Sequence, residues 1–196
     1  MANLKIKEGV QAALSLPETG PTIRRYFVNT IFDSTFVMLG IIIGSALSDF
    51  PNLHIVTVTI ITSSVALGIS TAASVFEAES LEQKRRIEEI EKALLRSLQD
   101  THIGSSSRAS ILLISFVNFL APITAGTVIL APFLLINASD IRLAAWTAVG
   151  LALSLLFVTG FFMGRLGKRN PWVQGGRMAI IGVAAFAVCF YIESII

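Results

Sequence analysis

The chain has little charge and almost no cysteine. Only 14% of its 196 residues are charged, against about 25% in a typical soluble domain. Cys189 is the sole cysteine, which excludes an intramolecular disulfide and a thiolate metal cluster. The sequence also lacks a Walker or dinucleotide glycine loop, an HExxH motif and a Ser/His/Asp constellation. We therefore expect no enzymatic activity and no bound cofactor.

Long apolar runs take the place of these motifs. Hydrophobic residues make up 54% of the chain, and the mean hydropathy is +0.74. A helix needs about 20 predominantly apolar residues to cross a bilayer. Five runs reach that length, at residues 26–47, 53–76, 109–136, 143–163 and 176–196. The sequence therefore predicts an all-α polytopic membrane protein, with a five-helix transmembrane domain over residues 26–196.

The basic residues predict how this domain is oriented. All fifteen Lys and Arg residues except Arg142 lie before the first run, between the second and third, or between the fourth run and the start of the fifth, where Arg177 is the second residue. The positive-inside rule then places the N-terminus in the cytoplasm and the C-terminus outside. Residues 1–25 become a cytoplasmic segment, with a mildly amphipathic pattern typical of an interfacial helix. We expect the plasma membrane in a prokaryote and a vacuolar-type membrane in a eukaryote.

The helical pattern of the second run continues past its apolar part. Residues 76–100 contain no Gly or Pro and are rich in strong helix formers. We therefore predict that the second helix leaves the bilayer near Phe76 and extends into the cytoplasm as an acidic helix over residues 77–103. A turn over residues 102–107 is expected to lead into the third run.

Acidic side chains of this extension are candidate ligands for a divalent cation. Carboxylate oxygens suit hard or borderline metal ions, and the first two of these acids lie where the helix leaves the membrane. The candidates are Glu77, Glu79, Glu82, Glu88 and Glu91. The alternative is a solvated helix whose acids pair with Lys or Arg four residues away. Both interpretations stay open for the distal acids.

Asp33 is the only acid inside the first apolar run. A carboxylate at that depth costs at least a few kcal/mol, so we interpret it first as an ion or proton site facing a bundle interior or a water-filled path. The alternative is an acid bonded to Asn29, Thr30 or Thr35 that organises helix packing.

The helical face that carries Asp33 also carries small and polar residues. Asn29, Asp33, Gly40 and Gly44 share this face, and the two glycines have the GxxxG spacing that permits close approach of another helix. The partner helix could come from the second or fifth run of the same chain. A second copy is the other possibility, since two Asp33 side chains could then converge on one cation, and symmetric homodimers are the commonest oligomers.

Four segments of the chain resemble the vacuolar iron transporter family, which includes the yeast calcium-sensitivity complementer. The segments are RRYFVNTIFDSTFVMLGIIIGSAL, LGISTAASVFEAESLEQKRRIEEIEKALLRSLQDT, LAPITAGTVILAPFLL and GGRMAIIGVAAFAVCFYI. The resemblance covers residues 22–196 and is greatest to short prokaryotic members. It implies a five-helix homodimer that exchanges Fe²⁺ or Mn²⁺ for protons, with Asp33 and its helical face in the translocation path. The expected partners are then membrane lipid and divalent metal ions, without nucleic acid.

The chain departs from this family in its second span. The family typically reads ISMGLGEYL there and this chain reads ISTAASVFE, so Thr71 stands at the methionine position and Val75 at the glutamate position. Glu77, two residues later, is a candidate replacement. The region between the second and third runs is about thirty residues long and has no methionine. A second functional class therefore stays open, a non-transporting membrane scaffold that binds partners through its cytoplasmic helix.

Overall fold

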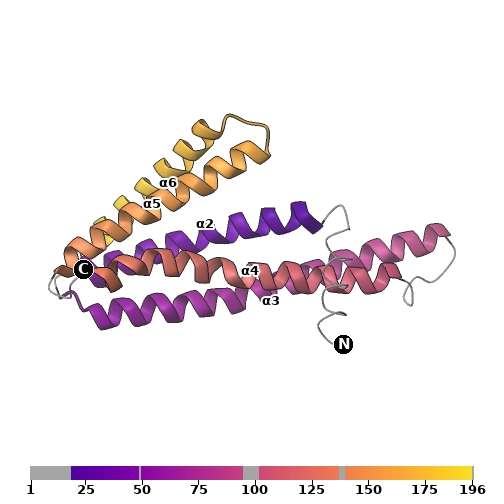
Figure 1. Ribbon diagram of the computed structural model, residues 1–196, viewed down its shortest axis with the longest axis horizontal. Helices are drawn as coiled ribbons and strands as arrows, with labels where there is room; N and C mark the ends of the chain where they lie inside the picture. Colours follow the sequence, from indigo (N-terminus) through magenta and orange to yellow (C-terminus); the bar gives the residue numbers. More distant parts are fainter. Residues whose placement is uncertain (1–18, 49, 95–101, 137–139, 196) are drawn as a thin grey trace. The chain divides into compact units, whose positions relative to one another are not determined.

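The computed structural model describes residues 19–48, 50–94, 102–136 and 140–195, without the side chains of residues 93–94 and 102–107. Within these residues the chain forms five helices, labelled in Figure 1: α2 (Thr19–Ala46), α3 (Leu53–Leu94), α4 (His102–Leu135), α5 (Ile141–Leu166) and α6 (Pro171–Glu193). Each helix contains a stretch long and apolar enough to cross a membrane. The predicted all-α polytopic membrane fold is therefore confirmed.

Several helices extend beyond the apolar runs that predicted them. α2 begins at Thr19, so the last part of the segment predicted as 1–25 is already helical, while the rest of that segment lies outside the described residues. α6 begins at Pro171, because proline suits the first helical position and the Asn170 side chain accepts a hydrogen bond from the Trp172 N–H at 3.1 Å.

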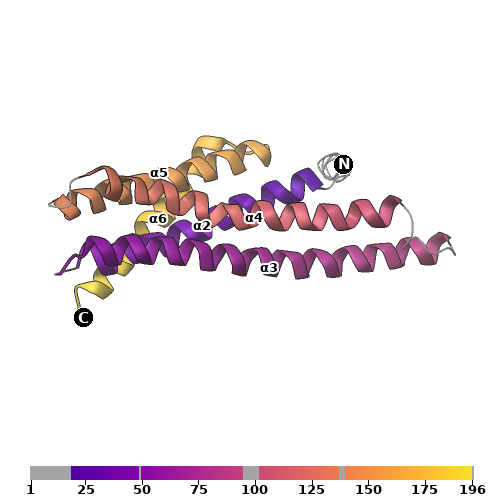
Figure 2. The same ribbon diagram turned by 60° about the horizontal axis from the view of Figure 1, so that its bottom comes forward.

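α3 is one uninterrupted helix of 42 residues. At 1.5 Å per residue it is about 63 Å long, roughly twice the thickness of a bilayer's hydrocarbon core. Figure 2 shows α3 as one continuous helix, with α4 beside its second part. The prediction of a continuous helix beyond the second apolar run is thus confirmed up to Leu94, and residues 95–101 lie outside the described part.

The turn predicted over residues 102–107 is wrong, because α4 already begins at His102. This stretch contains no proline, and extending an existing helix costs much less than nucleating one. The apolar run that follows is helical throughout, and the helix extends from it toward the N-terminus through Gly104 and Ser105 to His102.

The described residues form two compact units. The first contains the described residues up to Phe27 and those in Gly68–Leu120, and the second contains Val28–Leu67 and residues 121–195. α2, α3 and α4 each contribute a part to both units, whereas α5 and α6 belong entirely to the second.

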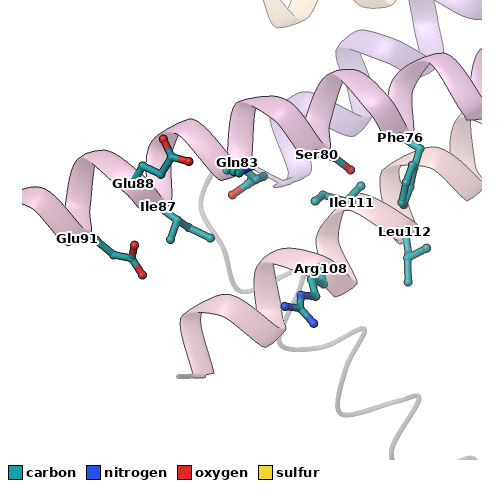
Figure 3. A pocket seen from close by; sticks show the side chains of 10 residues that line it. Phe76, Ser80, Gln83, Ile87, Glu88, Glu91, Arg108, Ile111 and Leu112 are labelled. Atoms are coloured by element: carbon teal, nitrogen blue, oxygen red, sulfur yellow. The ribbon is translucent and has the colours of Figure 1, made fainter. Parts of the chain in front are cut away.

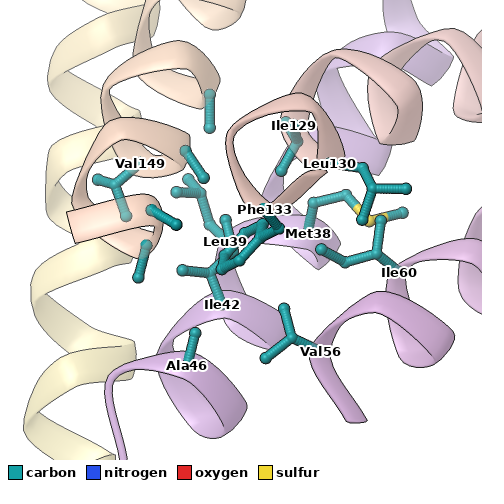
Figure 4. Close-up of a cluster of buried hydrophobic side chains, with 14 of the residues drawn as sticks. Met38, Leu39, Ile42, Ala46, Val56, Ile60, Ile129, Leu130, Phe133 and Val149 are labelled. Atoms are coloured by element: carbon teal, nitrogen blue, oxygen red, sulfur yellow. The ribbon is translucent and has the colours of Figure 1, made fainter. Parts of the chain in front are cut away.

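The second unit has an apolar core drawn from four of its helices. α2 supplies Met38, Leu39, Ile42 and Ala46, and Figure 4 shows these side chains meeting those of α3, α4 and α5. The other members are Val56, Ile60, Ile129, Leu130, Phe133, Ala144, Ala145, Ala148, Val149, Ala152 and Leu156. This core determines which face of α2 is turned inward.

α6 packs against α5 at glycines. A Cβ atom added at Gly164 would lie 2.8 Å from the Cα atom of Pro171, and one added at Gly175 would lie 2.9 Å from the Phe157 carbonyl oxygen. An added Cβ at Gly160 would lie 2.7 Å from Cγ of Met178. The two helices therefore approach to backbone contact, which small residues permit in membranes. Figure 1 shows them as an antiparallel hairpin.

The first unit contains polar contacts between helices beside buried apolar side chains such as Val75, Ile111 and Ile114. Thr19 Oγ1 and Ser110 Oγ lie 2.8 Å apart and are buried. The buried Asn118 side chain donates to the Thr71 carbonyl oxygen at 3.3 Å, which links α4 to α3. These bonds satisfy polar groups at positions where lipid would offer no partner.

Candidate functional site

Asp33 lies on the outer side of α2 within the second unit. Its side chain is exposed, as is that of Asn29 one turn earlier, whereas Met38 and Leu39 on the opposite face are fully buried in the core. The alternative of a packing acid bonded to neighbouring hydroxyls finds no support among the described residues, where Asp33 has no hydrogen-bond partner. The Thr35 hydroxyl donates instead to the Ile31 carbonyl oxygen, at 2.7 Å.

The glycines on the same face of α2 have free space beside them. A Cβ atom added at Gly40 or Gly44 would have no heavy atom within 4 Å among the described residues. From Asn29 to Gly44 the face spans less than a quarter turn at about 100° per residue. The four residues therefore lie on one face of α2, as predicted. On this face the two glycines leave the helix surface without side chains, and Asp33 supplies a carboxylate.

The structure distinguishes the candidate acids of α3 from one another. Glu79 is buried, with 8% of its surface exposed, and its carboxylate accepts a hydrogen bond from the Tyr26 hydroxyl. The guanidinium carbon of Arg25 lies 5.1 Å from the centre of the Tyr26 ring, within the range of a cation–π contact. Glu79 thereby ties α3 to the first part of α2 within the first unit.

The remaining acids of α3 are more open. Glu77, Glu82 and Glu88 are exposed, and Glu91 is partly buried. Among the described residues, no three His, Cys, Asp or Glu side chains are grouped closely enough to hold a metal ion. Asp33 belongs to the second unit and the five glutamates belong to the first, so their role as metal ligands stays a prediction.

The two positions that depart from the family pattern lie in the first unit. The Thr71 carbonyl accepts the hydrogen bond from Asn118, and Val75 is buried with 6% of its surface exposed. Glu77 is exposed, because a helix turns by about 200° over two residues. Glu77 therefore does not occupy the place of Val75, and this chain has no carboxylate there.

Sequence reasoning did not single out Tyr26 as a site residue. Tyrosines are enriched at membrane–water interfaces, and Tyr26 directly follows the pair Arg24 and Arg25. That signal predicts an interfacial position for the ring. It does not predict Glu79 as the hydrogen-bond partner, because the two residues lie on different helices.

Comparison with known proteins decides the family. Residues 82–194 match the VIT family. The chain belongs to the VIT family. The matched residues contain α4, α5, α6 and the end of α3, including Glu82, and they leave Asp33 outside. As a member of this family, the chain is an integral membrane protein that takes part in metal ion transport. The match confirms the family resemblance found in the sequence.

A relative of similar length supports the same assignment. The chain is 25% identical over 177 residues to the uncharacterized protein MJ0645 of Methanocaldococcus jannaschii, and the alignment covers 89% of this chain and 90% of that protein. This archaeal relative agrees with the expectation of a short prokaryotic-type member.

Proposed function

We propose that the protein exports Fe²⁺ or Mn²⁺ from the cytoplasm in exchange for protons, and that Asp33 binds both the metal ion and the proton. The observation that carries this proposal is the position of Asp33, an acid in an apolar helix that faces away from the core of its own unit. A carboxylate left against lipid at this depth is costly, so its face requires a polar path or another helix.

A second copy of the chain is the proposed partner for this face. Gly40 and Gly44 leave α2 open to close approach, and a two-fold axis places the same face of both copies together. Two Asp33 carboxylates then supply the negative charge that a divalent cation needs. Protonation of the pair releases the metal, which couples metal movement to proton movement in the opposite direction.

The exposed acids of α3 are proposed as the cytoplasmic entrance. Glu77 and Glu82 lie just beyond the apolar part of α3 and are open to solvent. Acids gathered at the mouth of a path raise the local concentration of cations, and carboxylate oxygens suit Mn²⁺ and Fe²⁺. This assignment uses the orientation from the positive-inside rule, with the N-terminus in the cytoplasm.

Transport by purified protein in liposomes tests the proposal directly. Addition of Mn²⁺ or Fe²⁺ outside, with one dye for the metal and one for pH inside, should show metal entry accompanied by proton exit. An imposed proton gradient should drive metal accumulation, and liposomes without protein should show neither signal. Metal entry without proton movement would replace exchange by uniport, and absence of metal entry would favour the membrane scaffold.

A further inference from the structure

An open pocket lies between the second part of α3 and the first part of α4, entirely within the first unit (Figure 3). Its volume is about 560 Å³, which falls in the usual range for small-ligand sites. Its walls combine apolar side chains with both signs of charge. The residues that matter for its chemistry are Phe76, Ile111, Leu112, Lys84, Arg108 and Glu88.

The pocket crosses the boundary between apolar and charged sequence. Phe76 is the last residue of the second apolar run, and Leu112 lies in the first turns of the third, after Arg108. Both apolar side chains are left open, with 40% and 61% of their surfaces exposed. One end of the pocket is therefore lined by residues of the apolar runs and the other by residues of the charged segment between them.

The charges follow a definite order from the apolar end outward. Figure 3 shows Phe76, Ile111 and Leu112 at one end and Glu88 toward the other, with Arg108 between them. Lys84 also lines the pocket, one helical turn or about 6 Å before Glu88 along α3. From the apolar end outward, Arg108 and Lys84 thus come before Glu88, and Ile87 and Glu91 also line the outer part.

These charges are available to a ligand. Within the described part of the chain, Lys84, Glu88 and Arg108 form no ion pair. Lys84 and Glu88 are four residues apart on one helix, but lysine before glutamate is the weaker order for such a pair. A ligand that carries both signs can satisfy all three side chains.

We propose that this pocket binds a zwitterionic aminophospholipid, with an acyl chain against Phe76 and Leu112, the phosphate at Arg108 and Lys84, and the primary ammonium at Glu88. Arginine and lysine are standard phosphate ligands, and an ammonium donates three hydrogen bonds of which a carboxylate accepts one or more. A phosphatidylglycerol leaves Glu88 without a cation. A choline headgroup lacks the N–H donors that Glu88 would accept from.

This inference is independent of the proposed transport, because its readout is lipid retention. Purified protein in detergent is titrated with phosphatidylethanolamine, phosphatidylglycerol and phosphatidylcholine of identical acyl chains, and bound lipid is counted by native mass spectrometry. We expect phosphatidylethanolamine to bind about tenfold more tightly than the other two, the usual effect of one hydrogen bond to a charged group. Equal affinity for the three lipids, or preference for phosphatidylglycerol or phosphatidylcholine, would overturn the proposal.

Single substitutions separate the two halves of the headgroup. Glu88→Gln should remove the preference for phosphatidylethanolamine while leaving affinity for phosphatidylglycerol unchanged or higher. Arg108→Gln should weaken the binding of all three lipids. Arg85→Gln and Glu89→Gln serve as matched controls, because both residues are exposed on α3 and do not line the pocket.

Glu88→Gln is decisive because Glu88 is exposed, so folding does not depend on its charge. Elution volume and thermal unfolding identical to wild type establish that each variant is folded. An unchanged lipid ratio in folded Glu88→Gln, or the same loss in Glu89→Gln, would show nonspecific lipid around the helices and overturn the assignment.

Discussion

Two pairs of glycines with identical spacing have opposite surroundings in the second unit. Gly160 and Gly164 in α5 are buried, and α6 occupies the space that their side chains would need. Gly40 and Gly44 in α2 have the same GxxxG spacing and face open space. The difference teaches that the motif alone states only that a helix can be approached closely. One pair is filled by a helix of the same unit, and the other, on the face of Asp33, has no heavy atom within 4 Å of an added Cβ among the described residues.

The largest effect is expected at the acid on the open face. Asp33→Asn keeps the shape and the polarity of the side chain but removes its charge and its titration, so metal-coupled proton movement in liposomes should fall to the level of empty liposomes. Thermal unfolding should stay at the wild-type temperature. Asp140→Asn is the matched control, since Asp140 is exposed outside the helical spans and its side chain makes no cap hydrogen bond. Wild-type flux in Asp33→Asn would leave Asp33 outside the path.

A larger side chain at the buried glycines of α5, Gly160 and Gly164, should strongly lower the stability of the protein. Gly164→Leu pushes a side chain into the backbone of Pro171, and overpacking of a well-packed site costs about 1–3 kcal/mol or more. We expect a lower unfolding temperature in detergent and loss of the folded form at expression temperature. Gly44→Leu, made as the comparison variant, should unfold at the wild-type temperature as a monomer. Equal stability of the two variants would contradict the described contact between α5 and α6.

Substitution of the glycines with free space beside them, Gly40 and Gly44, should weaken dimer assembly without changing the fold of one chain. The double variant Gly40→Leu with Gly44→Leu places two bulky side chains where two copies of α2 are proposed to meet. Dimer content in native membranes should fall, and transport should fall with it. Disulfide cross-linking of single cysteines along α2, in a Cys189→Ser background, measures the dimer. Transport that persists with no cross-linked dimer would place Asp33 in a site within one protomer.

The architecture was accessible from the sequence because its signals are local. Each apolar run is long enough to span a bilayer. Residues 77–94 are rich in strong helix formers and contain no Gly or Pro, which is why α3 continues as one helix. The turn over residues 102–107 was mispredicted because Gly and Ser suggest a break, while the helix that follows extends through them.

The contacts that distinguish one candidate residue from another are not local. Whether a glycine pair is filled depends on which helix lies across from it, and the approach of Pro171 to Gly164 follows from the short connection between α5 and α6. The bond from Tyr26 to Glu79 joins two helices that are distant in sequence. Periodicity places Asp33 and Gly40 on one face of α2, but only the core around Met38 shows that this face is turned outward.

Exposed and buried positions also differ among the acids of α3. Substitution of these acids is expected to have the smallest effect on metal transport. Glu77 and Glu82 are exposed, whereas Glu79 is buried and bonded to Tyr26. Replacing all three with Gln should raise the half-saturation concentration for metal more than it lowers the maximal rate, because the acids attract the cation before it reaches Asp33.

The exposed acids Glu77 and Glu82 should account for the electrostatic part of the rise in half-saturation concentration. Glu77→Gln with Glu82→Gln should raise half-saturation roughly threefold at low salt, since exposed charges contribute little individually. The rise should vanish near 1 M salt, where the Debye length is about 3 Å. Glu79→Gln alone should instead change stability and maximal rate, because it weakens the contact with Tyr26, and that change should persist in high salt. A salt-independent rise for the open pair, or none at all, would make these acids a solvated face of α3.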